Sequence, residues 1–65
     1  MFKIEITSVP DKDNLIAELW YNQSLVCEIS QETESLEIEI HEKINVPLDE
    51  FISALSKAKD RLENI

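Results

Sequence analysis

The chain has 65 residues, of which 43% are hydrophobic, and its 14 acidic and 6 basic residues give a formal net charge of −8. This length allows one small domain and leaves no room for a catalytic cleft between two lobes. The acidity argues against nucleic acid or an anionic membrane as a direct ligand, because both require clustered Lys and Arg.

The excess negative charge lies in the first two thirds of the chain. Residues 1–42 contain ten carboxylates and two lysines, whereas residues 43–65 contain four acids and four bases. The acidic part also has the periodicity of strands, so we expect its charge to lie on a folded sheet rather than on a disordered tail. A folded acidic surface suggests a basic partner.

Four strands are predicted in the acidic part. In residues 2–7, apolar and polar side chains alternate with the period of a half-buried strand. A segment with Pro10 and several turn-forming residues separates it from strands predicted over 15–21, 25–31 and 36–41. Short connections predict antiparallel neighbours in sequential order. Because the chain contains no Gly, its turns must use Asn, Asp, Ser or type I geometry.

A helix is predicted over about 47–63. Pro47 suits the first helical turn, and Asp49 and Glu50 suit the positive end of the helix dipole. An apolar stripe at three- and four-residue spacing consists of Leu48, Phe51, Ile52, Leu55, Ala58 and Leu62. We therefore expect one α+β domain over residues 1–65, a two-layer ββββα fold with the sheet over 2–41 and the helix on one face.

Alternation divides the strand residues between two faces. The face expected under the helix carries Phe2, Ile4, Ile6, Ala17, Leu19, Cys27, Ile29, Leu36, Ile38 and Ile40. The open face is expected to carry Lys3, Glu5, Ile16, Glu18, Trp20, Val26, Glu28, Glu37, Glu39 and His41. Five glutamates thus share one surface with three apolar side chains that water would cover unless a partner does.

This open face is the predicted partner-binding site. Its candidate residues are Glu5, Ile16, Glu18, Trp20, Val26, Glu28, Glu37 and Glu39. Trp20 would supply buried contact area, and the carboxylates would supply orientation and a fast encounter with a basic protein. Two alternatives stay open: an ordinary solvated sheet face with one tryptophan, and a Trp20 that packs under the loop at 8–14.

Enzymatic chemistry is not expected. Alternation sends Cys27 toward the helix and His41 to the opposite face, so the two cannot form a nucleophilic pair. Cys27 is expected in the core and has no second thiol, and His41 has no second histidine for a metal site. Residues 11–14 resemble the start of a calcium loop but lack its glycine and closing glutamate, so neither a metal nor a cofactor is predicted.

The pattern of residues 15–21, 25–32 and 36–40, closed by the helical residues 47–51 and 54–59, resembles small bacterial immunity proteins. These are encoded beside polymorphic or contact-dependent growth-inhibition toxins. The resemblance implies a cytoplasmic inhibitor that binds one toxin domain, often a nuclease, and blocks its active site or substrate groove. A cytoplasmic location is also expected because no secretory signal is visible after Met1.

A second hypothesis belongs to a different class. The chain could be an accessory or antitoxin-like regulatory domain that forms a homodimer through Trp20, Ile16 and Val26. A small sheet with a free edge can also self-associate, so homodimerisation stays open.

Overall fold

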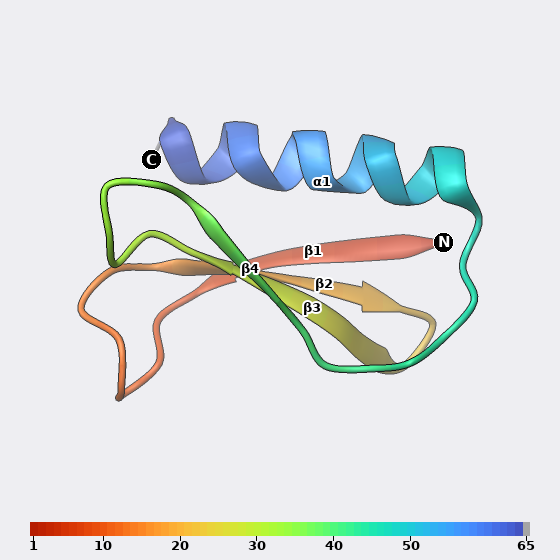
Figure 1. Ribbon diagram of the computed structural model, residues 1–65, viewed down its shortest axis with the longest axis horizontal. Coiled ribbons are helices and arrows are strands. Elements are labelled where there is room, and N and C mark those ends of the chain that lie inside the picture. The colour runs from red at the N-terminus through yellow and green to blue at the C-terminus, as the bar shows by residue number, and fades with distance from the viewer. Residues whose placement is uncertain (65) are drawn as a thin grey trace.

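Four antiparallel strands and one C-terminal helix make up the regular structure of residues 1–64, the part of the chain that the computed structural model describes (Figure 1). The elements are β1 (Phe2–Thr7), β2 (Ile16–Tyr21), β3 (Ser24–Ser30), β4 (Glu37–Ile40) and α1 (Leu48–Glu63). The strands lie in the order β1-β2-β3-β4. The predicted ββββα fold is confirmed. No helix within residues 1–64 is long and apolar enough to cross a membrane.

The helix begins one residue later than predicted. Pro47 has φ −60° and ψ 128°, which is extended backbone, so it precedes the helix instead of occupying its first turn. The carbonyl of Pro47 accepts the first helical bond, from the Phe51 N–H at 3.0 Å. Asp49 and Glu50 lie in the first turn and Arg61 in the last, where each charge complements the helix dipole.

The core forms between α1 and the middle of the sheet. From the sheet it contains Ala17, Leu19, Val26, Cys27 and Ile29, and from the helix Ala54, Ala58 and Leu62. The helical members follow one another at intervals of four residues and so lie on one side of α1. The small side chains of Ala54 and Ala58 let the helix backbone approach the sheet closely.

The helix packs chiefly against β1 and β2 and leaves β4 uncovered. Ile38 and Ile40 were expected beneath the helix, but 47% and 58% of their surfaces are exposed. The expectation fails because one helix is about 10 Å wide, whereas four strands spaced about 4.8 Å apart are wider. Phe51 also draws the helix toward β1, since its ring centroid lies 5.5 Å from that of Phe2.

A β-bulge in β3 changes which of its residues face the helix. Leu19 lies opposite Cys27, but the next residue, Trp20, lies opposite Leu25, so Val26 is an extra residue on β3. Val26 is buried in the core cluster. The prediction that Val26 lies on the open face was therefore wrong, and Leu25 takes the position beside Trp20.

The β2–β3 hairpin turns through Asn22 and Gln23, between the paired residues Tyr21 and Ser24. Asn22 has φ 57°, in the left-handed region. Asn tolerates this conformation better than most residues other than Gly. The prediction that this glycine-free chain turns through Asn is confirmed here.

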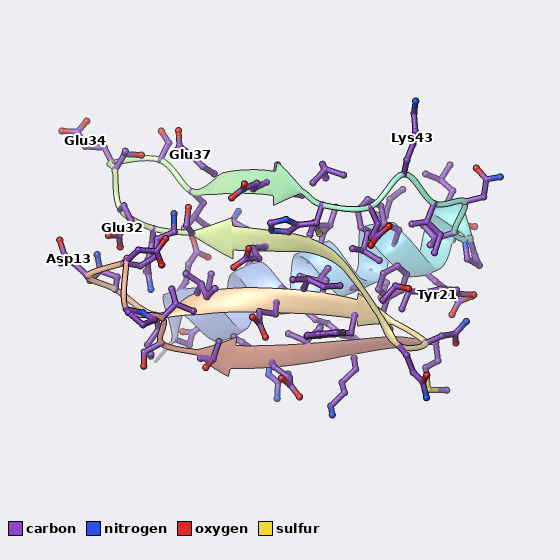
Figure 2. The ribbon with its side chains drawn as sticks, turned by 90° about the horizontal axis from the view of Figure 1, so that it is seen from below. Asp13, Tyr21, Glu32, Glu34, Glu37 and Lys43 are labelled. Carbon is purple, nitrogen blue, oxygen red and sulfur yellow. The ribbon has the colours of Figure 1, made fainter. Side chains whose placement is uncertain are left out.

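The loop between β1 and β2 is attached to the end of β3. The backbone N–H groups of Asp13 and Asn14 donate to the two oxygens of Glu32 at 2.7 and 2.9 Å, and Figure 2 shows Asp13 beside Glu32. The bonds, first that from Asp13, hold the pKa of Glu32 below its usual value. The amide of Gln31 donates to the Leu15 carbonyl at 2.9 Å.

Candidate functional site

Four glutamates form a straight row across the face of the sheet that is turned away from the helix. Glu5 on β1 lies opposite Glu18 on β2, Glu18 lies opposite Glu28 on β3, and Glu28 lies opposite Glu39 on β4. We call these residues the glutamate row. Directly opposed side chains on antiparallel strands have Cβ atoms about 5 Å apart, and like charges at that spacing destabilise a sheet.

Only part of this charge is balanced within residues 1–64. The Lys3 ammonium lies 3.0 Å from a carboxylate oxygen of Glu5. His41 forms a hydrogen bond through Nε2 with Glu28 Oε1. The indole N–H of Trp20 donates to Glu18 Oε1 at 3.3 Å, which satisfies an oxygen but adds no positive charge. The row therefore has acceptor capacity left for basic groups from outside.

Trp20 stands beside the row and is half-buried. Its neighbours across the strands are Lys3 and Leu25. A shallow hollow next to it is lined by Lys3, Glu5, Trp20, Asn22 and Gln23. The hollow could accept an apolar or aromatic side chain against the indole, while the carboxylate of Glu5 faces a basic group.

The predicted site residues divide into two sets. The set brought together on the open face consists of Glu5, Glu18, Trp20, Glu28, Glu37 and Glu39. Glu37 lies two residues before Glu39 on the outermost strand, where Figure 2 shows it at the sheet edge. Ile16 and Val26 form the other set, and their expected exposure was wrong, since only 0% and 3% of their surfaces reach solvent.

The burial of Ile16 and Val26 has two different causes. The bulge brings Val26 into the core under the helix. Ile16 lies outside that core cluster, at the start of β2, where the preceding loop is bonded to residues 31 and 32. Trp20 lies near the opposite end of β2, so the alternative in which Trp20 packs under this loop was also wrong.

Alternation missed one residue at this face, Leu25, and did not predict the hydrogen-bond partner of His41. Leu25 lies opposite Trp20 only because of the bulge, and no residue near Val26 in the sequence predicts that bulge. Alternation placed His41 on this face, where its ligand atom lies within 4.8 Å of those of Glu28 and Glu39, and its hydrogen bond joins it to Glu28 on the neighbouring strand. Which carboxylate bonds to His41 depends on the register between β3 and β4.

Cys27 lies in the core, as predicted, away from His41. Burial, and secondly the charge of Glu28, raises the pKa of its thiol to about 11. The thiol is therefore neutral at physiological pH, which is the unreactive form of a cysteine.

Three potential metal ligands do meet on the open face. Glu28, Glu39 and His41 each offer one ligand atom, and these atoms lie within 4.8 Å of one another. Exposed acidic groups commonly gather in this way without a metal. The expectation that the protein binds no metal stays a prediction, which zinc and calcium calorimetry would test.

Comparisons of this chain with family models, with curated proteins and with solved structures found no match. Its functional assignment therefore depends on the acidic face itself. An open surface with closely spaced carboxylates and one half-buried indole is suited to binding basic side chains of a protein.

Proposed function

We propose that this protein is an immunity protein that binds a basic toxin domain one to one and neutralises it in the cytoplasm. The toxin is a nuclease, an RNase or a DNase. The glutamate row carries the proposal, because it places four carboxylates side by side on one open face. Trp20 and Leu25 supply the apolar contact beside them.

The energetics of the row favour an external basic partner. Each like-charge contact at a solvated site costs a few tenths of a kcal/mol to about one. A domain this small has a narrow margin of stability, so repeated contacts of this kind matter. Lys and Arg from a partner would remove the repulsion, so binding would recover stability that the free protein lacks.

A nuclease is the basic partner that this surface fits best. A nuclease holds phosphate groups with Lys and Arg, so its substrate groove has the opposite charge to the glutamate row. A protein that occupies the groove with carboxylates would exclude RNA or DNA from it. The same charges would speed the encounter, and the Trp20 contact would slow dissociation.

Tagged protein recovered from its native host, with washes of increasing salt, would test this function. The expected result is one stoichiometric basic protein that is toxic when expressed alone and harmless when co-expressed with this chain. Recovery of no such protein, or of a partner whose toxicity is unchanged by co-expression, would count against the proposal.

The binding face is tested on that complex with matched charge reversals. Glu18→Lys with Glu28→Lys should slow association by about tenfold or more and weaken its salt dependence. Glu34→Lys with Glu63→Lys changes the net charge equally but lies off the open face, and it should have a smaller effect. Equal effects of the two pairs would show that only net charge matters.

The contact of Trp20 is tested separately. Trp20→Ala should mainly raise the dissociation rate, because it removes apolar contact rather than long-range attraction. Ile16 and Val26 are buried, so they cannot form the apolar interface of a homodimer together with Trp20.

A further inference from the structure

The two edges of the sheet differ in how they are protected. At the β1 edge, the helix packs alongside, and Arg61 Nη1 donates to the Ile4 carbonyl at 3.2 Å. This bond occupies an outward backbone acceptor that another strand would need. The β1 edge is thus blocked in the way that natural sheets avoid unwanted pairing.

The β4 edge has no such protection. The His41 N–H donates to the Val26 carbonyl at 2.8 Å, so the backbone groups of residue 41 point toward β3. Backbone groups alternate in direction along a strand, so those of Ile38 and Ile40 point away from β3. Within residues 1–64, β4 is the last strand of the sheet, and Figure 2 shows no segment beyond it.

An apolar surface continues from this edge toward the helix. Ile38 and Ile40 are exposed at the edge, and Leu48 and Ile52 of α1 have 69% and 54% of their surfaces exposed. Leu55 lies one turn beyond Ile52 on the same side of the helix. A hollow between helix and edge is lined by Ile29, Leu36, Glu37, Ile38, Leu55 and Lys59.

The opposite side of the same edge is acidic. Glu37 and Glu39 alternate with Ile38 and Ile40, and Glu28 lies beside Glu39 on the neighbouring strand. A segment that paired with β4 would therefore meet apolar side chains on one face and carboxylates on the other. The matching segment alternates apolar residues with Lys or Arg.

We infer that the β4 edge binds an extended segment of the basic partner, which adds a fifth strand to the sheet. This inference rests on the proposed function, and it states how that partner is held. The segment's apolar side chains cover Ile38 and Ile40, and its basic side chains reach Glu37 and Glu39. Main-chain hydrogen bonds to residues 38 and 40 supply affinity, and the alternation of apolar and basic side chains along the segment supplies selectivity.

A second copy of this chain fits the edge poorly. Antiparallel pairing of two β4 strands would place the Glu37 and Glu39 side chains of the copies on the same face, next to one another. Each copy also carries a net charge of −8. Charge therefore favours a basic strand over self-pairing.

Blocked synthetic peptides of about eight residues, an ordinary strand length, provide the test. One alternates Lys and Val, and a second has the same composition with all Lys residues before all Val residues. With the alternating peptide, amide exchange at Ile38 and Ile40, followed by NMR, should slow by about tenfold at saturation. The block peptide has equal charge and should leave these amides unchanged.

Two changes remove the proposed backbone bonds. N-methylation of the alternating peptide at one nitrogen that faces β4 deletes one donor without altering the protein. Ile40→Pro deletes a protein N–H that the β3–β4 pairing does not use, a position where an edge strand tolerates Pro. Each should weaken binding about two- to tenfold, the usual range for one net hydrogen bond.

The outcomes separate this inference from the proposed function. If the alternating, block and methylated peptides bind equally, and Glu18→Lys with Glu28→Lys weakens that binding, edge pairing is overturned. The acidic face would then remain the binding site. Protection of Ile38 and Ile40 that survives those charge reversals would support edge pairing even if the glutamate row is not the site. Concentration-dependent protection of these amides without peptide would assign the edge to a second copy and overturn the inference.

Discussion

At the scale of single residues, Cys27 shows how burial sets the chemistry of a side chain. Its thiol pKa is raised from 9.0 to about 11 in the folded protein. Below pH 9 the thiol is protonated in both the folded and the unfolded chain, so the folded state keeps the full stability that the buried, neutral thiol allows. As the pH rises from about 9 to about 11, the unfolded chain loses its proton first, and the free energy of unfolding must fall.

Urea unfolding at about pH 8 and about pH 10.5 checks this prediction in the wild type and in Cys27→Ala. The wild type should lose more stability between the two pH values than the variant does. All other residues are the same in both proteins, so their effects cancel in the comparison. An equal loss in both would show that the Cys27 thiol is not protected by burial.

Asn22 gives a second prediction at this scale. Because its φ is 57°, Asn22→Ala should destabilise the protein by about 1 kcal/mol, the cost of a left-handed conformation for a residue with a Cβ. Asn22→Gly should cost little or nothing. Gln23→Ala, at the adjacent turn position, is the control and should be nearly neutral. Thermal unfolding measures all three, and equal effects of Ala and Gly at position 22 would contradict the prediction.

At the scale of elements, the glutamate row places one negative charge on each of four neighbouring strands, and these charges repel one another. Glu18 lies between Glu5 and Glu28, and it also accepts the Trp20 N–H. Glu18→Gln keeps an oxygen for that bond and removes the central charge. We expect it to raise the free energy of unfolding by a few tenths of a kcal/mol to about one at low salt.

The matched control is Glu34→Gln. Glu34 is exposed in the loop between β3 and β4, and in Figure 2 its side chain points away from the sheet. It should change stability less than Glu18→Gln does. Urea unfolding at low and high salt measures the difference, which should shrink with salt because exposed charges are screened. If contacts within the protein already remove the repulsion in the glutamate row, Glu18→Gln and Glu34→Gln would change stability equally at any salt concentration.

At the scale of the whole molecule, charge opposes association of identical chains. Each chain has a net charge of −8 and a mass of 7.5 kDa, and its uncovered β4 edge carries Glu37 and Glu39. We therefore expect sedimentation equilibrium to give the monomer mass from micromolar to millimolar protein at low salt. A dimer mass that Ile38→Lys abolishes would contradict this and identify the β4 edge as a self-association surface.

The amino-acid sequence by itself determined the order and type of the elements. Alternation over Phe2–Thr7 and the later strands, the short connections and the apolar stripe of the helix all depend on residues close in the chain. The same alternation placed Glu5, Glu18, Glu28 and Glu39 on one face. A two-residue period fixes the face of each side chain wherever the strand stays regular.

Only the tertiary structure decided where that regularity ends and what each face contacts. The bulge exchanged Val26 for Leu25 on the open face, and the lateral position of the helix left Ile38 and Ile40 exposed at the β4 edge. Both outcomes arise because register and helix placement depend on packing between distant segments, such as Phe2 against Phe51 and the alanines of α1 against β2. Local periodicity contains no information about those distances, so the acidic face followed from sequence, whereas the exposure of Ile38 and Ile40 at the β4 edge did not.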